Sequence, residues 1–163
     1  MYAVNKGLVS ATEKEIQALK DVLKDKNFRS EGKIPYIPFI DASQSLQAKV
    51  KLSRFDQGSG IFFVTYMSTE GGPISNDHLR YIFEGLTSDG KYYVLAEIPV
   101  SVTFLPEGTS EDYERYERKK LSSEVVKNYR SSITKRLEKL PTNGFHPDLK
   151  YLEELIASLK IEK

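Results

Sequence analysis

The chain has 163 residues, enough for one hydrophobic core and too few for two, so we expect a single domain over 1–163 in which residues 1–10 are disordered. Its 24 basic and 23 acidic side chains leave a net charge of +1, which argues against a nucleic-acid partner, because such proteins usually carry a clear basic excess. Hydrophobic residues at 39% and charged residues at 29% exclude wholesale disorder. The absence of cysteine excludes disulfides, thiolate metal sites and cysteine nucleophiles.

The N-terminal part of the chain has the pattern of an amphipathic helix. Thr12 and Glu15 match a capping box, and the apolar residues that follow form one stripe at helical spacing. This pattern predicts a helix over 12–25. The segment 34–40, IPYIPFI, contains two prolines that each remove a backbone donor, so it is predicted to be an extended or edge segment.

The middle of the chain has the patterns of β-strands. From Leu46, apolar and polar residues alternate as in a half-exposed strand, and residues 61–67, IFFVTYM, are apolar on both faces, as in a strand near a sheet centre. Asp89-Gly90 predicts a hairpin with a type I′ turn. The predicted register pairs Tyr81 with Ile98, Phe83 with Ala96, Gly85 with Val94, Thr87 with Tyr92, and, on the other face, Ile82 with Glu97, Glu84 with Leu95, Leu86 with Tyr93.

The C-terminal third of the chain has the patterns of helices. A charged helical pattern begins at Ser110, an apolar stripe runs from Val126 to Leu140, and a last helix begins near Asp148. Strands that precede helices in this way predict an α+β fold: an antiparallel sheet of meanders or hairpins, packed by one N-terminal helix and two or three C-terminal helices.

Catalytic and metal sites have weak support in the sequence. His78 and His146 lie far apart in the chain and match no metal motif, and we expect no metal, no cofactor and no catalytic residue. The alternative is a small hydrolase that uses Glu84 and Glu97, or Asp77 and His78. In the first pair the two carboxylates share one face of the hairpin, where Arg80 lies diagonal to Glu97; a solvated sheet face explains them more simply.

The loop STEGGPISND, residues 68–77, is long for a strand connection, and loops held by a rigid sheet often bind ligands. We predict a ligand-binding surface beside it. A small cleft there would be lined by Tyr66, Tyr81, Tyr92 and Tyr93. The predicted ligand-binding residues are Asn76, His78, Tyr66, Tyr81, Arg80 and Glu97.

The helix over the apolar stripe is strongly basic. Five cations accompany only Glu124 and Glu138: Lys127, Arg130, Lys135, Arg136 and Lys139. Such a run is usually a solvated face, but it also supports a second alternative, a cytosolic interaction domain that binds an acidic partner.

Two segments resemble a family of uncharacterised bacterial exported proteins and lipoproteins. The first is PISNDHLRYIFEGLTSDGKYYVLAEIPV, with its GLTSDGKYYV hairpin, and the second is the closing FHPDLKYLEELIASLKI. The ending LIASLKI also resembles, faintly, the closing element of the Mog1/PsbP-like α/β/α sandwich. The resemblance implies an extracytoplasmic location, a membrane tether through a lipidated cysteine upstream of residue 1, and an envelope component or small ligand as partner. The alternative location is the cytoplasm.

Overall fold

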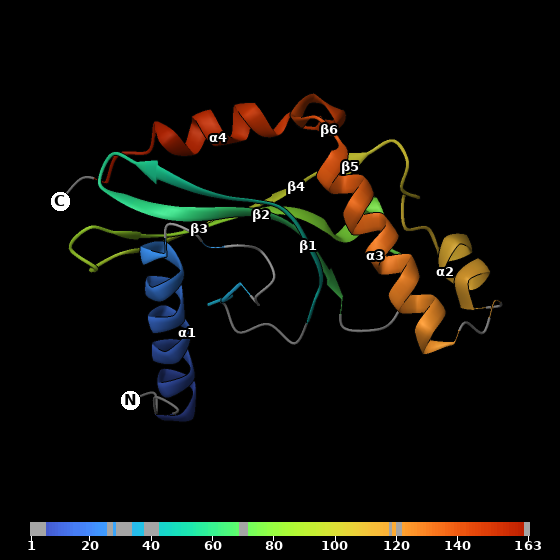
Figure 1. Cartoon of the computed structure of the whole chain (residues 1–163), viewed down its shortest axis with the longest axis horizontal. Coiled ribbons are helices and arrows are strands. Elements are labelled where there is room, and N and C mark those ends of the chain that lie inside the picture. The colour runs from blue at the N-terminus through green and yellow to red at the C-terminus, as the bar shows by residue number, and fades with distance from the viewer. Residues whose placement is uncertain are drawn as a thin grey trace.

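The computed structural model has an α+β fold, as predicted, in which an antiparallel sheet lies between helices (Figure 1). It describes residues 6–25, 28, 34–37, 43–68, 72–117, 119 and 122–161. The helices are α1 (Lys6–Lys24), η1 (Asn76–His78), α2 (Ser110–Glu117), α3 (Ser123–Lys139), η2 (Thr142–Gly144) and α4 (Leu149–Ala157). The strands are β1 (Ser43–Phe55), β2 (Gly58–Ser68), β3 (Leu79–Thr87), β4 (Tyr93–Pro99), β5 (Ser101–Val102) and β6 (Phe145–His146).

The main sheet has the strand order β1-β2-β3-β4, so β2 and β3 are its inner strands. The register predicted for the hairpin of β3 and β4 is confirmed, including the pairs of Phe83 with Ala96 and of Glu84 with Leu95. The predicted type I′ turn is wrong. Such a turn requires a positive φ at both central residues, and of Asp89 and Gly90 only Gly90 has one, of 68°. The Asp89 carboxylate instead accepts from the Thr87 hydroxyl and from the Lys91 N–H, which holds a different turn at the same register.

Each face of the sheet carries its own hydrophobic core. The face under α3 and α4 buries Phe62, Tyr81 and Phe83, and the opposite face, under α1, buries Ile61, Phe63 and Ile82. Figure 1 shows α1 on one side of the strands and α4 on the other. Successive residues of a strand point to opposite faces, so β2 and β3 are apolar on both.

The alternation predicted for β1 is wrong after Ala48. Leu46 and Ala48 belong to the core under α3 and α4, but Val50 packs against the core under α1. The pairing of β1 with β2 shifts between Ala48 and Lys51, where Lys49 has a φ of 56°. A β-bulge of this kind adds a residue to one strand, so the side chains that follow it point to the opposite faces of the sheet. Lys51 therefore points toward α4, where its Nζ lies 2.5 Å from Glu153 Oε2.

The N-terminal helix begins at Lys6, six positions before the predicted start at Thr12. The expectation of disorder over residues 1–10 is therefore wrong for 6–10, and residues 1–5 lie outside the described part of the chain. A capping box is a preference of about 1 kcal/mol and does not stop a helix from extending. The predicted stripe is confirmed, because Leu19 is fully buried against the sheet with Ile16, Val22 and Leu23 around it.

Asn76 connects the start of β3 to the second sheet, in which β5 pairs with β6. Its side-chain Nδ2 donates to the carbonyls of Val102 and Leu105 at 3.2 and 3.4 Å, and its Oδ1 accepts from the Val102 N–H at 3.0 Å. Its own N–H donates to the Pro106 carbonyl at 2.8 Å. Asn76 thereby ties η1 to the chain that returns through β5.

We predict that Asn76→Ala lowers the free energy of unfolding by about 3 kcal/mol, because it leaves the buried Val102 N–H without an acceptor. Urea titration of the variant measures the loss. Asn143→Ala, at an exposed position in η2, is the matched control and should unfold within about 0.5 kcal/mol of the wild type. Equal midpoints for both variants would contradict the structural role of Asn76.

Candidate functional site

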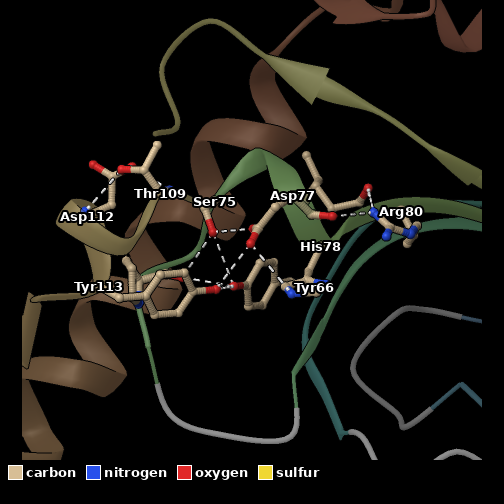
Figure 2. A network of polar contacts seen from close by, with 10 residues as sticks. Tyr66, Ser75, Asp77, His78, Arg80, Thr109, Asp112 and Tyr113 are labelled. Atoms are coloured by element: carbon tan, nitrogen blue, oxygen red, sulfur yellow. Dashed lines mark hydrogen bonds and ion pairs between the residues drawn. The ribbon is translucent and has the colours of Figure 1, made fainter. Parts of the chain in front are cut away.

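A network of hydroxyl and carboxylate groups lies where β2, η1 and α2 meet (Figure 2). The Tyr66 hydroxyl lies 3.0 Å from the Pro73 carbonyl, 3.2 Å from Ser75 Oγ and 3.1 Å from the Tyr113 hydroxyl. Ser75 donates to Asp77 Oδ1 at 2.6 Å and Tyr113 donates to Asp77 Oδ2 at 3.3 Å. Burial is the main reason that the pKa of Tyr66 is raised, so this hydroxyl stays protonated.

A line of charged and polar side chains runs from this network along the end of β3. His78 Nε2 lies 3.5 Å from Asp77 Oδ2, and Arg80 Nη1 donates to the Asp77 carbonyl at 2.9 Å. Arg80 Nε lies 3.4 Å from Glu97 Oε1, and the Tyr36 hydroxyl donates to Glu97 Oε2 at 3.0 Å. We call Asp77, His78, Arg80 and Glu97 the rim; the His78 side chain is 52% exposed.

The chemistry of the network is that of a scaffold. The Ser75 hydroxyl is fully buried and donates to Asp77, so it has no contact with an imidazole that could activate it as a nucleophile. His78 packs its ring edge against Tyr66, with centroids 6.0 Å apart. The described geometry therefore positions His78 and Arg80 firmly and builds no nucleophile–base pair.

The six predicted ligand-binding residues are only partly brought together. Tyr66 lies beside His78, and Arg80 pairs with Glu97. Tyr81 points to the same sheet face as Tyr66 and to the opposite face from Arg80 and Glu97; it stacks on Phe62 at 5.1 Å and donates to Glu153 of α4. Asn76 is 9% exposed and its amide is used within the fold.

The predicted cleft of four tyrosines does not form. Tyr66 and Tyr81 are buried in the core under α3 and α4, whereas Tyr93 packs on the opposite face and Tyr92 is exposed near the hairpin turn. Three residues that hold the network and the rim were not predicted from the sequence: Ser75, Tyr113 and Tyr36. The only sequence signal for them is that a buried tyrosine in a strand requires a hydrogen-bond partner from elsewhere.

Glu84 is the one fully buried acidic or basic side chain of the described residues, with 0% exposure. The predicted shared face with Glu97 is confirmed, but the solvated environment is wrong for Glu84. It lies in a row across the sheet that consists of Leu52, Ile61, Glu84 and Leu95. Neither carboxylate oxygen has a hydrogen-bond partner of good geometry, and neither has the Tyr93 hydroxyl.

Burial raises the pKa of Glu84 to about 8. The Tyr93 hydroxyl and the Ile37 backbone N–H act against this shift, and the negative charge of Glu15 on α1 adds to it. The charged groups around it are therefore Glu15 from the helix above and, along the sheet, Glu97 with its partner Arg80. At neutral pH Glu84 is mainly the uncharged acid.

The remaining predicted residues lie apart from the rim. His146 is exposed in β6, opposite Ser101, and across the described ranges no three His, Asp or Glu side chains gather to hold a metal. On α3, Arg136 stacks on Phe104 at 3.9 Å. Lys127, Arg130, Lys135 and Lys139 have no ion-pair partner within the described chain.

Comparisons with known proteins supply no relative: no family model matches the chain, and no curated protein or solved structure is significantly similar to it. Within the described residues, no helix has both the length and the apolar character that crossing a membrane requires.

We predict that the contribution of Glu84 to the stability of the wild type falls as pH rises between about 4.5 and 8. The pKa of Glu84 is raised from 4.5 to about 8, so its contribution is complete below 4.5 and is lost progressively up to about pH 8, because over this range the unfolded chain has released the proton and the folded protein still holds it. One proton gives a slope of at most about 1.4 kcal/mol per pH unit.

The variants Glu84→Gln and Glu84→Met should each flatten this part of the curve, since neither side chain titrates. Urea midpoints measured from pH 5 to pH 9 for the three proteins make the comparison, in which other titrating groups cancel. Parallel curves for wild type and both variants would show that Glu84 ionises normally.

Proposed function

We propose that this protein is a non-enzymatic binding module that acts outside the cytoplasm and contacts its ligand through the rim. The observation that carries the proposal is the way in which the rim is held. Arg80 is fixed by the Asp77 carbonyl and by Glu97, and Asp77 is fixed by Ser75 and Tyr113. Side chains fixed before binding lose little conformational entropy when a ligand arrives.

The rim also offers both kinds of hydrogen-bonding group to a partner. His78 and Arg80 can donate, and Asp77 and Glu97 can accept. Their side chains are exposed by 52%, 20%, 28% and 40% respectively, so each is reachable from solvent. A polar envelope component, or a small ligand with donors and acceptors, fits this arrangement.

Binding is favoured over hydrolysis because the candidate catalytic groups are unsuited to it. Glu84 has no exposed surface, so a substrate has no path to its carboxylate in this conformation. Among the described residues, the hydroxyls of Ser75 and Tyr113 contact Asp77 of this pair, and no hydroxyl is hydrogen-bonded to the His78 imidazole. A binding role uses the same residues without either requirement.

The extracytoplasmic location rests on the resemblance of residues 73–100 and 145–161 to exported bacterial proteins and lipoproteins. A lipidated cysteine upstream would tether such a module to the membrane, and would leave its rim free to contact the envelope.

We expect His78→Ala and Arg80→Gln each to weaken binding to purified envelope of the native host at least about tenfold, since each removes a fixed donor. Cosedimentation with cell walls and with membranes measures it. Lys91→Ala is the matched control, because this exposed cation lies near the hairpin turn at the other end of β3. Binding that survives both rim variants and fails in the control would contradict the proposal.

We expect fractionation of the native host to place the protein in the envelope, with a mature N-terminus that mass spectrometry shows to be signal-cleaved or lipidated. An unprocessed chain in the cytosol would contradict export. That result would leave the fold and the rim unchanged, and it would favour the alternative hypothesis of a cytosolic partner that binds the basic helix α3.

A further inference from the structure

The first half of α3 and the start of β1 border an open hollow of about 600 Å³. Its volume exceeds the 340–380 Å³ of three other surface hollows. In the view of Figure 1, α3 lies well apart from α1. The lining residues are Ser45, Ser123, Val126, Lys127, Arg130, Ser131 and Thr134.

The polar groups of this hollow are almost all free hydrogen-bond donors. Lys127 and Arg130 have no carboxylate within 4 Å in the described chain, and no acidic side chain lines the hollow. Ser45, Ser123 and Ser131 can each donate a hydroxyl proton, whereas Thr134 already donates to the Arg130 carbonyl at 3.0 Å. A hollow with two cations and three hydroxyls and no acid is chemically complementary to an oxyanion.

The cations of the hollow between β1 and α4 are bound within the fold, whereas the neighbouring hollow on α3, lined by Lys135, Arg136 and Lys139 and sharing Ser131, also has no acidic side chain. In the hollow between β1 and α4, the Lys49 ammonium donates to the backbone carbonyl of Glu138, the Lys49 backbone N–H donates to the Glu138 carboxylate, and Lys51 forms an ion pair with Glu153. Glu138, one of the two acids of α3, is thereby engaged by Lys49 of β1. The excess charge of α3, five basic against two acidic side chains, therefore gathers on its solvent side, in a chain whose net charge is only +1.

We propose that the hollow between α3 and β1 binds a phosphate-bearing anion, with Arg130 and Lys127 as the charged ligands of the phosphate and Ser45 and Ser131 as hydroxyl donors. A guanidinium can hold two phosphate oxygens at once and an ammonium supplies a point charge beside it. The volume leaves room for an organic group attached to the phosphate, as in a phosphate monoester or a phospholipid headgroup.

This proposal is independent of the rim, which is formed by η1, β3 and β4. Loss of phosphate binding would leave the rim proposal standing, and loss of envelope binding by rim variants would leave the phosphate site standing.

The test is a titration of the full chain with inorganic phosphate and with glycerol 3-phosphate, followed by backbone amide NMR shifts. We expect saturable shifts at Ser45, Arg130 and Ser131 by about 10 mM ligand, as for a site of millimolar affinity. Arg130→Gln and Lys127→Gln should each weaken binding about tenfold. Lys135→Gln, a cation of the same helix outside the hollow, is the matched control and should change binding less than about twofold.

A second experiment, with vesicles of phosphatidylglycerol and phosphatidylcholine, distinguishes a lipid headgroup from a free phosphate compound as the ligand. Vesicle binding that is lost in Arg130→Gln and kept in Lys135→Gln would identify a lipid headgroup, and binding of the soluble phosphates alone would identify a free phosphate compound. Absence of shifts at about 10 mM would overturn the proposal. It would also be overturned by equal losses in all three variants, or by binding to duplex DNA alone, because both indicate unspecific attraction to the basic helix.

Discussion

The structure depends on the two-sided burial of β2 and β3. Both strands are apolar on both faces, so each face of the sheet must be covered by another layer. The C-terminal helices α3 and α4 cover one face, and α1 with residues 34–37 covers the other. The sheet separates the two cores, and each buried apolar side chain of the inner strands belongs to one of them.

This constraint also explains the unusual position of Glu84. In a strand with a period of two, the residue between Phe83 and Gly85 must face the side of Ile82 and Leu86, which is the side that α1 covers. An ionised carboxylate without hydrogen bonds is costly there, so the group remains uncharged to a higher pH. The proton on Glu84 and the packing of α1 over the sheet are thus coupled.

Polar groups outside the cores are used in two different ways. Around Tyr66, Ser75 and Asp77, hydroxyls and a carboxylate satisfy one another and fix the loop that leads into β3. Gly108 belongs to this arrangement, because it has a φ of 88° and any larger side chain there would collide with the Asp77 carboxylate. On α3, by contrast, Lys127, Arg130, Lys135 and Lys139 have no ion-pair partner in the described part of the chain, and the charge of that surface is open to an external anion.

Local patterns determined much of the fold. The hairpin register followed from the position of Asp89-Gly90, and the class followed from strands that precede helices, because both depend on residues close in sequence. The bulge at Lys49, which sends Val50 to the other core, had no local signal. The burial of Glu84 and the partners of Tyr66 were likewise decided by tertiary structure. The environment of Glu84 depends on α1, whose Glu15 lies 69 positions before it in the chain. The hydrogen bond of the Tyr66 hydroxyl depends on Tyr113, which lies 47 positions after it. Sequence determined which residues of the β3–β4 hairpin share a face; only the packing of distant segments decided which face is dry, which charge is paired and which is left to bind.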